Sequence, residues 1–233
     1  MANQARLFDS GTGLPAGPPL PHGHAVQARL RPDGGAILFS CDIEGTLWQI
    51  DPRSRKPLGG TMSGIVGVTP KGAAYSPDGR RILAGDISGN VRLWDARTGR
   101  PVTEARALDW GVSAVAFSAD GHTGFVATYG GTVQAIDVDT GDFIGPPLKS
   151  EAGAWIDELR FERRAGLVVG ASSIMFSAYA WSVSWLQSGQ DTDLRLRAQV
   201  LATQRVNASG GLDPVPLEEW RALRERLAKE EKR

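Results

Sequence analysis

Few residues in this sequence have the type and spacing that acid–base, nucleophilic or metal chemistry requires. The three histidines are His22, His24 and His122. His22 and His24 precede an expected strand, and His122 follows an Asp-Gly turn. The sequence contains neither the His-Glu-x-x-His zinc motif nor the Gly-x-Ser-x-Gly nucleophile motif. We therefore expect the histidines to be structural or merely exposed, and we assign no catalytic residue.

Two other features could suggest chemistry. Asp137, Asp139 and Asp142 crowd three carboxylates into six residues, but no glutamate follows at the spacing of an EF-hand, and a turn between two strands explains the segment equally well. The single cysteine, Cys41, excludes an intrachain disulfide and any multi-cysteine zinc site. It stands beside an acid with no basic neighbour to stabilise a thiolate, which favours a buried filler. We expect no cofactor, no metal and no enzyme.

The charge balance excludes further classes of protein. The 233 residues hold 26 Lys and Arg against 26 Asp and Glu, so the formal net charge is zero and no basic stripe points to nucleic acid. No stretch approaches the roughly 20 apolar residues of a membrane helix. The opening MANQARLFDS lacks the apolar core of a signal peptide. We expect a soluble, cytoplasmic protein that binds neither nucleic acid nor membrane.

A repeat explains the sequence better than any active site does. The chain holds 29 glycines and 14 prolines, and many of the glycines recur at fixed intervals. Asp-Gly pairs begin at Asp33, Asp78 and Asp120, which are 45 and 42 residues apart. A second series of aspartates is spaced by 42, 44 and 42 residues: Asp9, Asp51, Asp95 and Asp137. Markers that keep one register indicate a structural repeat of about 42 to 45 residues.

Each repeat reads as four short antiparallel strands. In the third repeat an apolar run, 112–117, is followed by the Asp120-Gly121 turn and a second run, 124–128. Gly130-Gly131 then makes a turn into the alternating segment 132–137. Thr140-Gly141 makes the last turn before a fourth strand, so the repeat predicts a four-stranded meander.

Residues Ser76 to Asp95, SPDGRRILAGDISGNVRLWD, resemble a WD40 repeat almost throughout, with Trp94-Asp95 as the name-giving dipeptide. The neighbouring repeats have Phe8, Ile50 and Ile136 at the tryptophan position. The resemblance covers about residues 5 to 183 and implies β-propeller blades. WD40 blades often carry a hydrogen-bond network with a turn aspartate. Here that position reads Glu44, Ser88 and Gly130, so we expect the network to be absent or incomplete.

The fold expected from this resemblance is all-β, with about four WD40-type blades and a ring that can be incomplete. Residues 1–23 would form a partial blade, and the repeat region would cover 24–186, with blades at about 24–63, 64–107, 108–149 and 150–186. Four blades are fewer than a propeller usually has, so three explanations stay open: a part of a longer protein, two chains that complete one ring, or a small closed ring. Open strand edges would favour self-association.

The remaining residues, 187–233, predict a short helical tail. Residues 191–203 are amphipathic, 207–211 read as a turn, and Leu217, Trp220, Leu223 and Leu227 form one helical stripe. The stripe predicts a helix that docks on the last blade, with a partner-binding helix as the alternative. This ending resembles the tails of bacterial multi-repeat WD40 proteins, some of which carry an N-terminal serine/threonine kinase. The kinase signatures themselves are not in this chain.

The resemblance implies a non-catalytic scaffold that binds a protein partner, because nothing in the sequence indicates chemistry. The alternative is a detached regulatory or sensor portion of a larger bacterial protein, such as a WD40-containing kinase. Trp110 and Trp155 are the candidate partner-binding residues, since each begins a blade on the side that carries loops. Core packing is the competing explanation for both tryptophans.

Overall fold

The computed structural model describes residues 5–20, 25–41, 46–64, 68–164, 166–183, 204–206 and 212–214. Its strands form the following sheets. The first sheet contains β1 (Ala25–Leu30), β2 (Ile37–Cys41), β3 (Leu47–Ile50) and β4 (Pro57–Met62). The second contains β5 (Val68–Tyr75), β6 (Arg81–Asp86), β7 (Asn90–Asp95) and β8 (Arg106–Ala107). The third contains β9 (Val112–Phe117), β10 (Thr123–Thr128), β11 (Thr132–Asp137) and β12 (Phe143–Lys149). The fourth contains β13 (Glu158–Glu162), β14 (Leu167–Ser172) and β15 (Ser177–Ser182).

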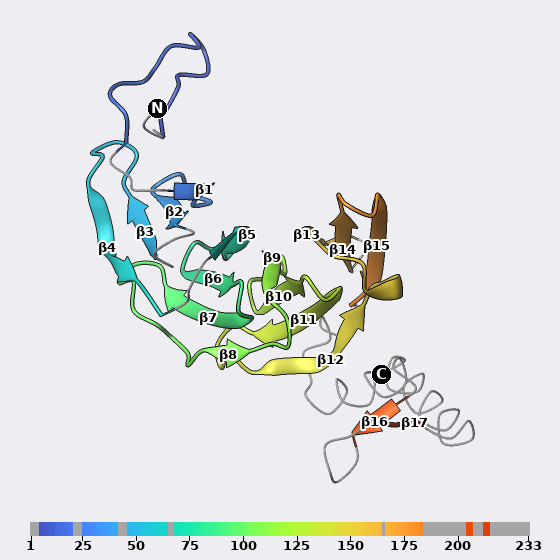
Figure 1. Cartoon of the computed structure of the whole chain (residues 1–233). Coiled ribbons are helices and arrows are strands. Elements are labelled where there is room, and N and C mark those ends of the chain that lie inside the picture. Colours follow the sequence, from blue (N-terminus) through green and yellow to red (C-terminus); the bar gives the residue numbers. More distant parts are fainter. Residues whose placement is uncertain are drawn as a thin grey trace.

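The expectation of an all-β chain built from about four antiparallel sheets is confirmed. The sheets follow one another in an arc, with β1, β5, β9 and β13 on its inner side (Figure 1). One parallel bridge, Lys71 to Ala114, joins the second and third sheets. The arrangement is consistent with a propeller-like fold, but the described residues do not close a ring.

The tail differs in part from its expectation. The helices expected over 191–203 and 217–227 lie outside the described residues, as do His22 and His24. In the sequence between those two segments, β16 (Gln204–Val206) and β17 (Leu212–Pro214) pair antiparallel. In the described parts of the chain the one helical element is the 3-10 turn Glu151–Gly153.

The Asp-Gly turns have the same geometry in three sheets. Each closes with a hydrogen bond from the glycine amide to a carbonyl three residues earlier: Gly34 to Arg31 (2.8 Å), Gly79 to Ser76 (2.9 Å) and Gly121 to Ser118 (3.1 Å). Their φ angles of 72°, 70° and 79° lie in the left-handed region that favours glycine. The recurring glycines therefore mark these turns.

Successive Asp-Gly turns also pack on one another, except at the last junction. Gly79 lies against Arg31 and Pro32, and Gly121 lies against Pro77 and Ser76. In the third sheet, Ala119 stands at the position that Pro32 and Pro77 occupy in the first two sheets. The fourth sheet has no Asp-Gly pair. A pocket of about 240 Å³ is present at this junction, lined by Ser118, Ala119, Asp120, Thr123, Phe125, Phe161 and Arg163.

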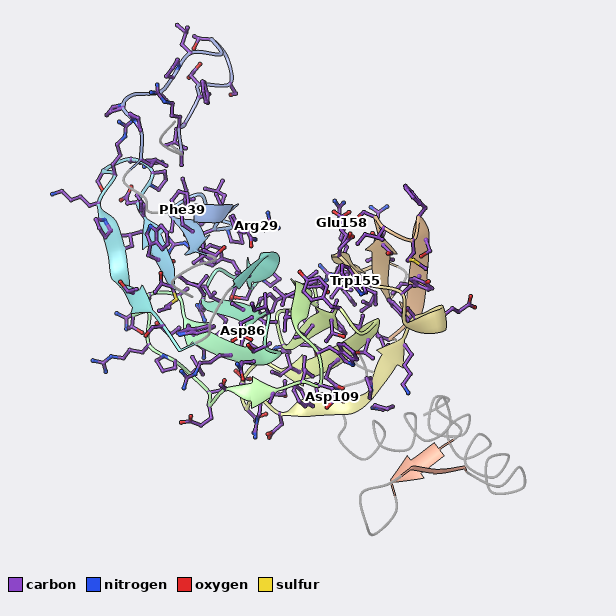
Figure 2. The ribbon with its side chains drawn as sticks, viewed as in Figure 1. Arg29, Phe39, Asp86, Asp109, Trp155 and Glu158 are labelled. Carbon is purple, nitrogen blue, oxygen red and sulfur yellow. The ribbon has the colours of Figure 1, made fainter. Side chains whose placement is uncertain are left out.

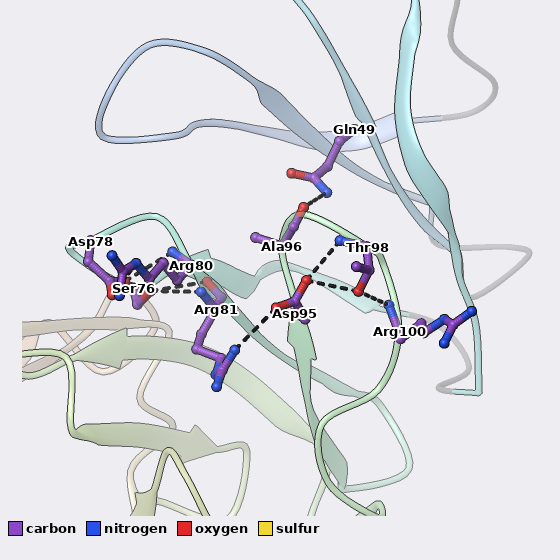
Figure 3. A network of polar contacts seen from close by, with 9 residues as sticks. All are labelled: Gln49, Ser76, Asp78, Arg80, Arg81, Asp95, Ala96, Thr98 and Arg100. Carbon is purple, nitrogen blue, oxygen red and sulfur yellow. Dashed lines mark hydrogen bonds and ion pairs between the residues drawn. The ribbon is translucent and has the colours of Figure 1, made fainter.

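The turns that follow the third strands of the first three sheets are each held by an aspartate. Asp95 accepts hydrogen bonds from the amide and the hydroxyl of Thr98, both at 2.8 Å, and lies 3.4 Å from Arg81 (Figure 3). Asp9 makes the same pair of bonds with Thr12. Asp51 and Asp137 accept bonds from the corresponding amides. The aspartate series found in the sequence is therefore a series of turn-closing acceptors.

The core lies between the sheets. Trp94 is fully buried between the first and second sheets, in a cluster with Leu38, Met62 and Ile82. Buried polar side chains also connect these sheets: Gln49 donates to the Ala96 carbonyl (2.6 Å, Figure 3) and accepts from the Tyr75 hydroxyl (2.6 Å). Burial raises the pKa of Tyr75, which therefore keeps its donor proton.

The two ends of the arc are covered differently. At the first sheet, residues 5–20 form a bridged hairpin that packs Ala5, Leu7 and Leu20 over buried Ile37 and Phe39. At the fourth sheet, the face turned away from the third sheet has exposed Glu158 and Arg160 on its first strand. The corresponding residues of β9, 44 positions earlier, are Ala114 and Ala116, which are buried against the fourth sheet.

We predict that Ala119→Pro stabilises the protein by about 0.4–1 kcal/mol, because proline restricts the unfolded chain at a position whose turn geometry it matches. Pro32 and Pro77 occupy the same position of turns that close with the same hydrogen bond. Thermal unfolding would measure the gain as a higher Tm. A lower Tm would mean that the third turn differs in backbone geometry from the other two.

We also predict that acid destabilises the fold. Hydrogen bonds from Thr12 lower the pKa of Asp9, and those from Ser54 lower the pKa of Asp51. Burial works to raise the pKa of Asp95, but the bonds from Thr98 outweigh it and lower that pKa. Because the unfolded chain then binds more protons, this stability is present above the ordinary aspartate pKa and is lost as the pH falls through the folded values. The Tm should therefore drop below about pH 4.

Asp95→Asn should make this acid dependence shallower, and Asp139→Asn is the matched control, since no hydrogen bond to its side chain is found in the described part of the chain. Identical pH profiles for both variants and the parent protein would contradict the assignment of acid sensitivity to these turns.

Candidate functional site

Two edges of the arc can carry function, because antiparallel strands bring their connections alternately to one side and the other. One edge carries the Asp-Gly and Thr-Gly turns. The other carries the turns between second and third strands and the connectors that lead into the next sheet. Several exposed apolar side chains gather on this second edge: Ile87, Trp110, Trp155, Ile174, Met175 and Phe176. Together with half-buried Tyr129, we call these residues the aromatic edge.

Backbone contacts within each sheet and between neighbouring sheets position the aromatic edge. Each connector is hydrogen-bonded to a turn of the sheet that it leaves. The Leu108 amide donates to the Gly89 carbonyl (2.9 Å), and the Ser150 amide donates to the Gly131 carbonyl (2.8 Å). The backbone amide of Tyr129, in the turn of the third sheet, donates to the Gly111 carbonyl at 2.9 Å. A methyl group on Gly111 would collide with the carbonyl of Ile87, so glycine is needed for this approach.

The aromatic rings lie in sequence along this edge. The Trp110 ring lies directly on Gly130, where an added Cβ atom would come within 2.5 Å of the Trp110 Cγ atom and 2.7 Å of Nε1. Tyr129, the neighbour of Gly130, meets Trp155 edge to face, with ring centroids 5.2 Å apart and planes at 63°. Trp110 and Trp155 are therefore connected through Tyr129 and Gly130.

A shallow apolar pocket continues the aromatic edge beyond Trp155. It has a volume of about 240 Å³ and is lined by Gly153, Ala154, Trp155, Ile174 and Met175. Trp155 therefore has Tyr129 on one side and this pocket on the other. The pocket has room for a large aliphatic or aromatic side chain of a partner.

The charges near the aromatic edge are mainly negative. Asp109 precedes Trp110, and Glu151 and Asp157 flank Trp155 in the chain (Figure 2 labels Asp109 and Trp155). Asp157 accepts hydrogen bonds from the amide of Ser173 (3.1 Å) and from its hydroxyl. Burial, and secondarily the nearby charge of Asp157, raise the pKa of Tyr129. An anionic group therefore lies close to the Tyr129 and Trp155 pair.

The opposite edge has a different character. Several of its charges are paired within the chain, as in Arg31 with Asp33 (2.7 Å) and Arg81 with Asp95 (3.4 Å). Its pocket contains Asp120. Burial works to raise the pKa of that carboxyl, but the hydrogen bonds from the Ser118 hydroxyl and the His122 amide outweigh it, so the pKa is lowered. Among the described residues no three His, Cys, Asp or Glu side chains gather so as to hold a metal ion.

The candidate residues named from the sequence are both on the surface. Trp110 is 59% exposed and Trp155 is 46% exposed, so neither is a core residue. Sequence reasoning missed Tyr129, Ile87 and residues 174–176. Their common signal is their position between the second and third strands of successive repeats. It also missed Asp86, a buried residue that holds the β6–β7 turn through the amides of Ser88 and Asn90, each at 2.9 Å.

We predict that Gly130→Ala displaces Trp110 at little cost in stability, below about 1 kcal/mol, because only a side chain must move. Gly111→Ala should cost more, about 1–3 kcal/mol, because its new methyl group meets the Ile87 carbonyl. Fluorine NMR of fluorotryptophan-labelled protein would report Trp110, and urea unfolding would report stability. An unchanged Trp110 resonance in Gly130→Ala would contradict the described ring contact.

Comparison with known proteins supports the fold alone. No family model matches the chain, and no curated protein matches it either. A solved structure of hydrazine synthase from Kuenenia stuttgartiensis is similar, with a TM-score of 0.60 and 16% identity over 69% of this chain. The computationally designed protein Ika4 has a TM-score of 0.57 and 17% identity over 68% of this chain and 91% of its own. The chain spans about half, 46%, of the matched hydrazine synthase chain. In the described residues no helix is long and apolar enough to cross a membrane.

Proposed function

We propose that this chain is a non-catalytic interaction module of WD40 type, which binds a protein partner through its aromatic edge. The observation that carries this proposal is the connected row of exposed side chains from Trp110 through Tyr129 and Trp155 to the pocket beside Met175. Large exposed apolar groups that are contiguous and held by a rigid backbone are typical of protein-binding surfaces.

Aromatic side chains suit this role for a physical reason. Tryptophan and tyrosine bury much area at little entropic cost and often account for most of the affinity of an interface. Here the backbone that carries these side chains is held by contacts within and between sheets, so it is not a free loop. The surface is therefore preorganised, which reduces the entropy lost on binding.

The assignment to the WD40 type rests on the repeat. The 42 to 45 residue period coincides with four-stranded antiparallel sheets, and Trp94-Asp95 occupies the end of a third strand, with the tryptophan in the core. In this proposal the sheets are propeller blades that present connectors along one edge.

A second candidate function is the regulatory or sensor portion of a larger bacterial protein, such as a WD40-containing kinase. The open arc favours it, because a further part of the same protein could supply the missing contacts of the fourth sheet. Self-association of two copies is the other way to supply them. Light scattering of the purified chain would test self-association, since a monodisperse species of 24.9 kDa would argue against it.

We predict that Trp110→Ala and Trp155→Ala each weaken partner capture by about 30-fold, which corresponds to about 2 kcal/mol for an interface anchor. Affinity capture from lysate followed by mass spectrometry would identify the partner, and titration of that partner would give the affinities.

Phe8→Ala is the matched control. Phe8 is 60% exposed, close to the exposure of Trp110, but it belongs to the N-terminal hairpin. Equal losses in all three variants, or none in the two tryptophan variants, would overturn the proposal that the aromatic edge is the binding surface.

A further inference from the structure

We propose that the segment bound at the aromatic edge is basic, with an arginine that stacks on the aromatic rings and a large aliphatic residue that enters the pocket beside Trp155. This inference rests on the proposed function and names the chemistry of the partner.

The charge on this edge supports a basic partner. The turns and connectors that form it are 86–90, 107–112, 128–132, 149–157 and 172–177, all within the described residues. Their ionisable acids and bases are Asp86, Asp109, Lys149, Glu151 and Asp157. Asp86 is buried and bonded within its own turn, and half-buried Asp157 accepts hydrogen bonds from Ser173. The two exposed acids, Asp109 and Glu151, still outnumber the single lysine, and Asp157 adds a third negative charge. A positively charged segment would be attracted here, whereas a phosphate-rich or acidic ligand would be repelled.

The rings and carboxylates are combined in a way that favours arginine over lysine. A guanidinium can stack on the face of Trp110 or Trp155 and at the same time form two hydrogen bonds to a carboxylate. Asp157 follows Trp155 by two residues in the same connector, and Tyr129 touches Trp155. An ammonium group has the charge but lacks the flat surface and the paired donors.

The pocket supplies the second part of the recognition. Its apolar walls come from Trp155, Ile174 and Met175, and its volume of about 240 Å³ exceeds that of a leucine side chain. A partner segment with arginine close to leucine, methionine or phenylalanine would occupy both features. The opposite edge cannot compete for such a segment in the same way, because many of its acids already have arginine partners within the chain.

The test uses the full chain and four synthetic peptides of about ten residues, with blocked ends and a fluorescent label. The peptides share one leucine and a Gly-Ser background and differ only in whether arginine, lysine, glutamine or glutamate fills the variable positions. Fluorescence anisotropy gives their affinities.

We expect the arginine peptide to bind at least about tenfold more tightly than the glutamine and glutamate peptides, and about threefold more tightly than the lysine peptide. Raising the salt from about 50 mM to about 300 mM should weaken the arginine peptide and leave the glutamine peptide unchanged.

A charge-neutral variant locates the effect. Asp109→Asn, Glu151→Gln and Asp157→Asn together should weaken the arginine peptide at least about tenfold, because each carboxylate contributes attraction at this edge. The control changes the same number of acids elsewhere, with Glu104→Gln, Asp139→Asn and Glu162→Gln, and should stay within about twofold. Thermal unfolding of both variants verifies that they are folded.

The outcomes separate this inference from the proposed function. If the tryptophan variants lose the captured partner but the arginine and glutamine peptides bind equally, the edge binds a partner without selecting for basic residues, and this inference is wrong. If no peptide binds at about 1 mM, it is also wrong, since such a weak contact could not select a partner. If the arginine peptide binds but the tryptophan variants have no effect on it, the basic site lies elsewhere and the assignment to this edge is overturned.

Discussion

The close approach of backbone to backbone where neighbouring sheets meet is the constraint on which the rest of this structure depends. A turn of one sheet touches the connector of the next, and a side chain would not fit between them. Gly111 against Ile87 and Gly89 against the Trp110 carbonyl are the clearest cases. Hydrogen bonds from the backbone amides of Leu108, Tyr129 and Ser150 extend the strand pairing within each sheet and hold the connectors in place beside these contacts. Because the sheets are locked at this edge, the side chains that the connectors carry are held in a fixed row.

The same contacts explain why the two edges of the arc differ in chemistry. On the aromatic edge, glycines in the turns leave room for large side chains, as Gly130 does beneath the ring of Trp110. On the opposite edge, the turns are closed by aspartates that need polar partners, and arginines pair with several of them. Apolar surface therefore collects on one side and paired charge on the other. The partner binding that we propose and the stability of the turns would then depend on different edges of the same strands.

The sequence predicted the fold better than the site, for physical reasons. Turn chemistry is local, so Asp-Gly pairs and turn aspartates mark strand ends wherever they occur, and their period revealed the sheets. Trp110 and Trp155 could be chosen because aromatic residues before a strand are conspicuous. Their exposure, and the part played by Tyr129 and Met175, depend on how close two sheets come, which no local pattern encodes. The pocket beside Phe161 was likewise not predicted. It lies at the junction where Ala119 stands in place of the earlier prolines and where the fourth sheet has no Asp-Gly pair.

The exposed face of the fourth sheet makes the two ends of the arc chemically different. Its inner strand presents Glu158 and Arg160, an exposed pair 3.4 Å apart, where the third sheet presents two alanines. A plain apolar sheet laid over this face would take both charges out of water, at a cost of several kcal/mol for each ion left without compensation. The hairpin end, by contrast, is closed by aliphatic contacts. A neighbouring sheet that places charged or polar groups opposite Glu158 and Arg160 would therefore pack on this face at lower cost than a purely apolar sheet would.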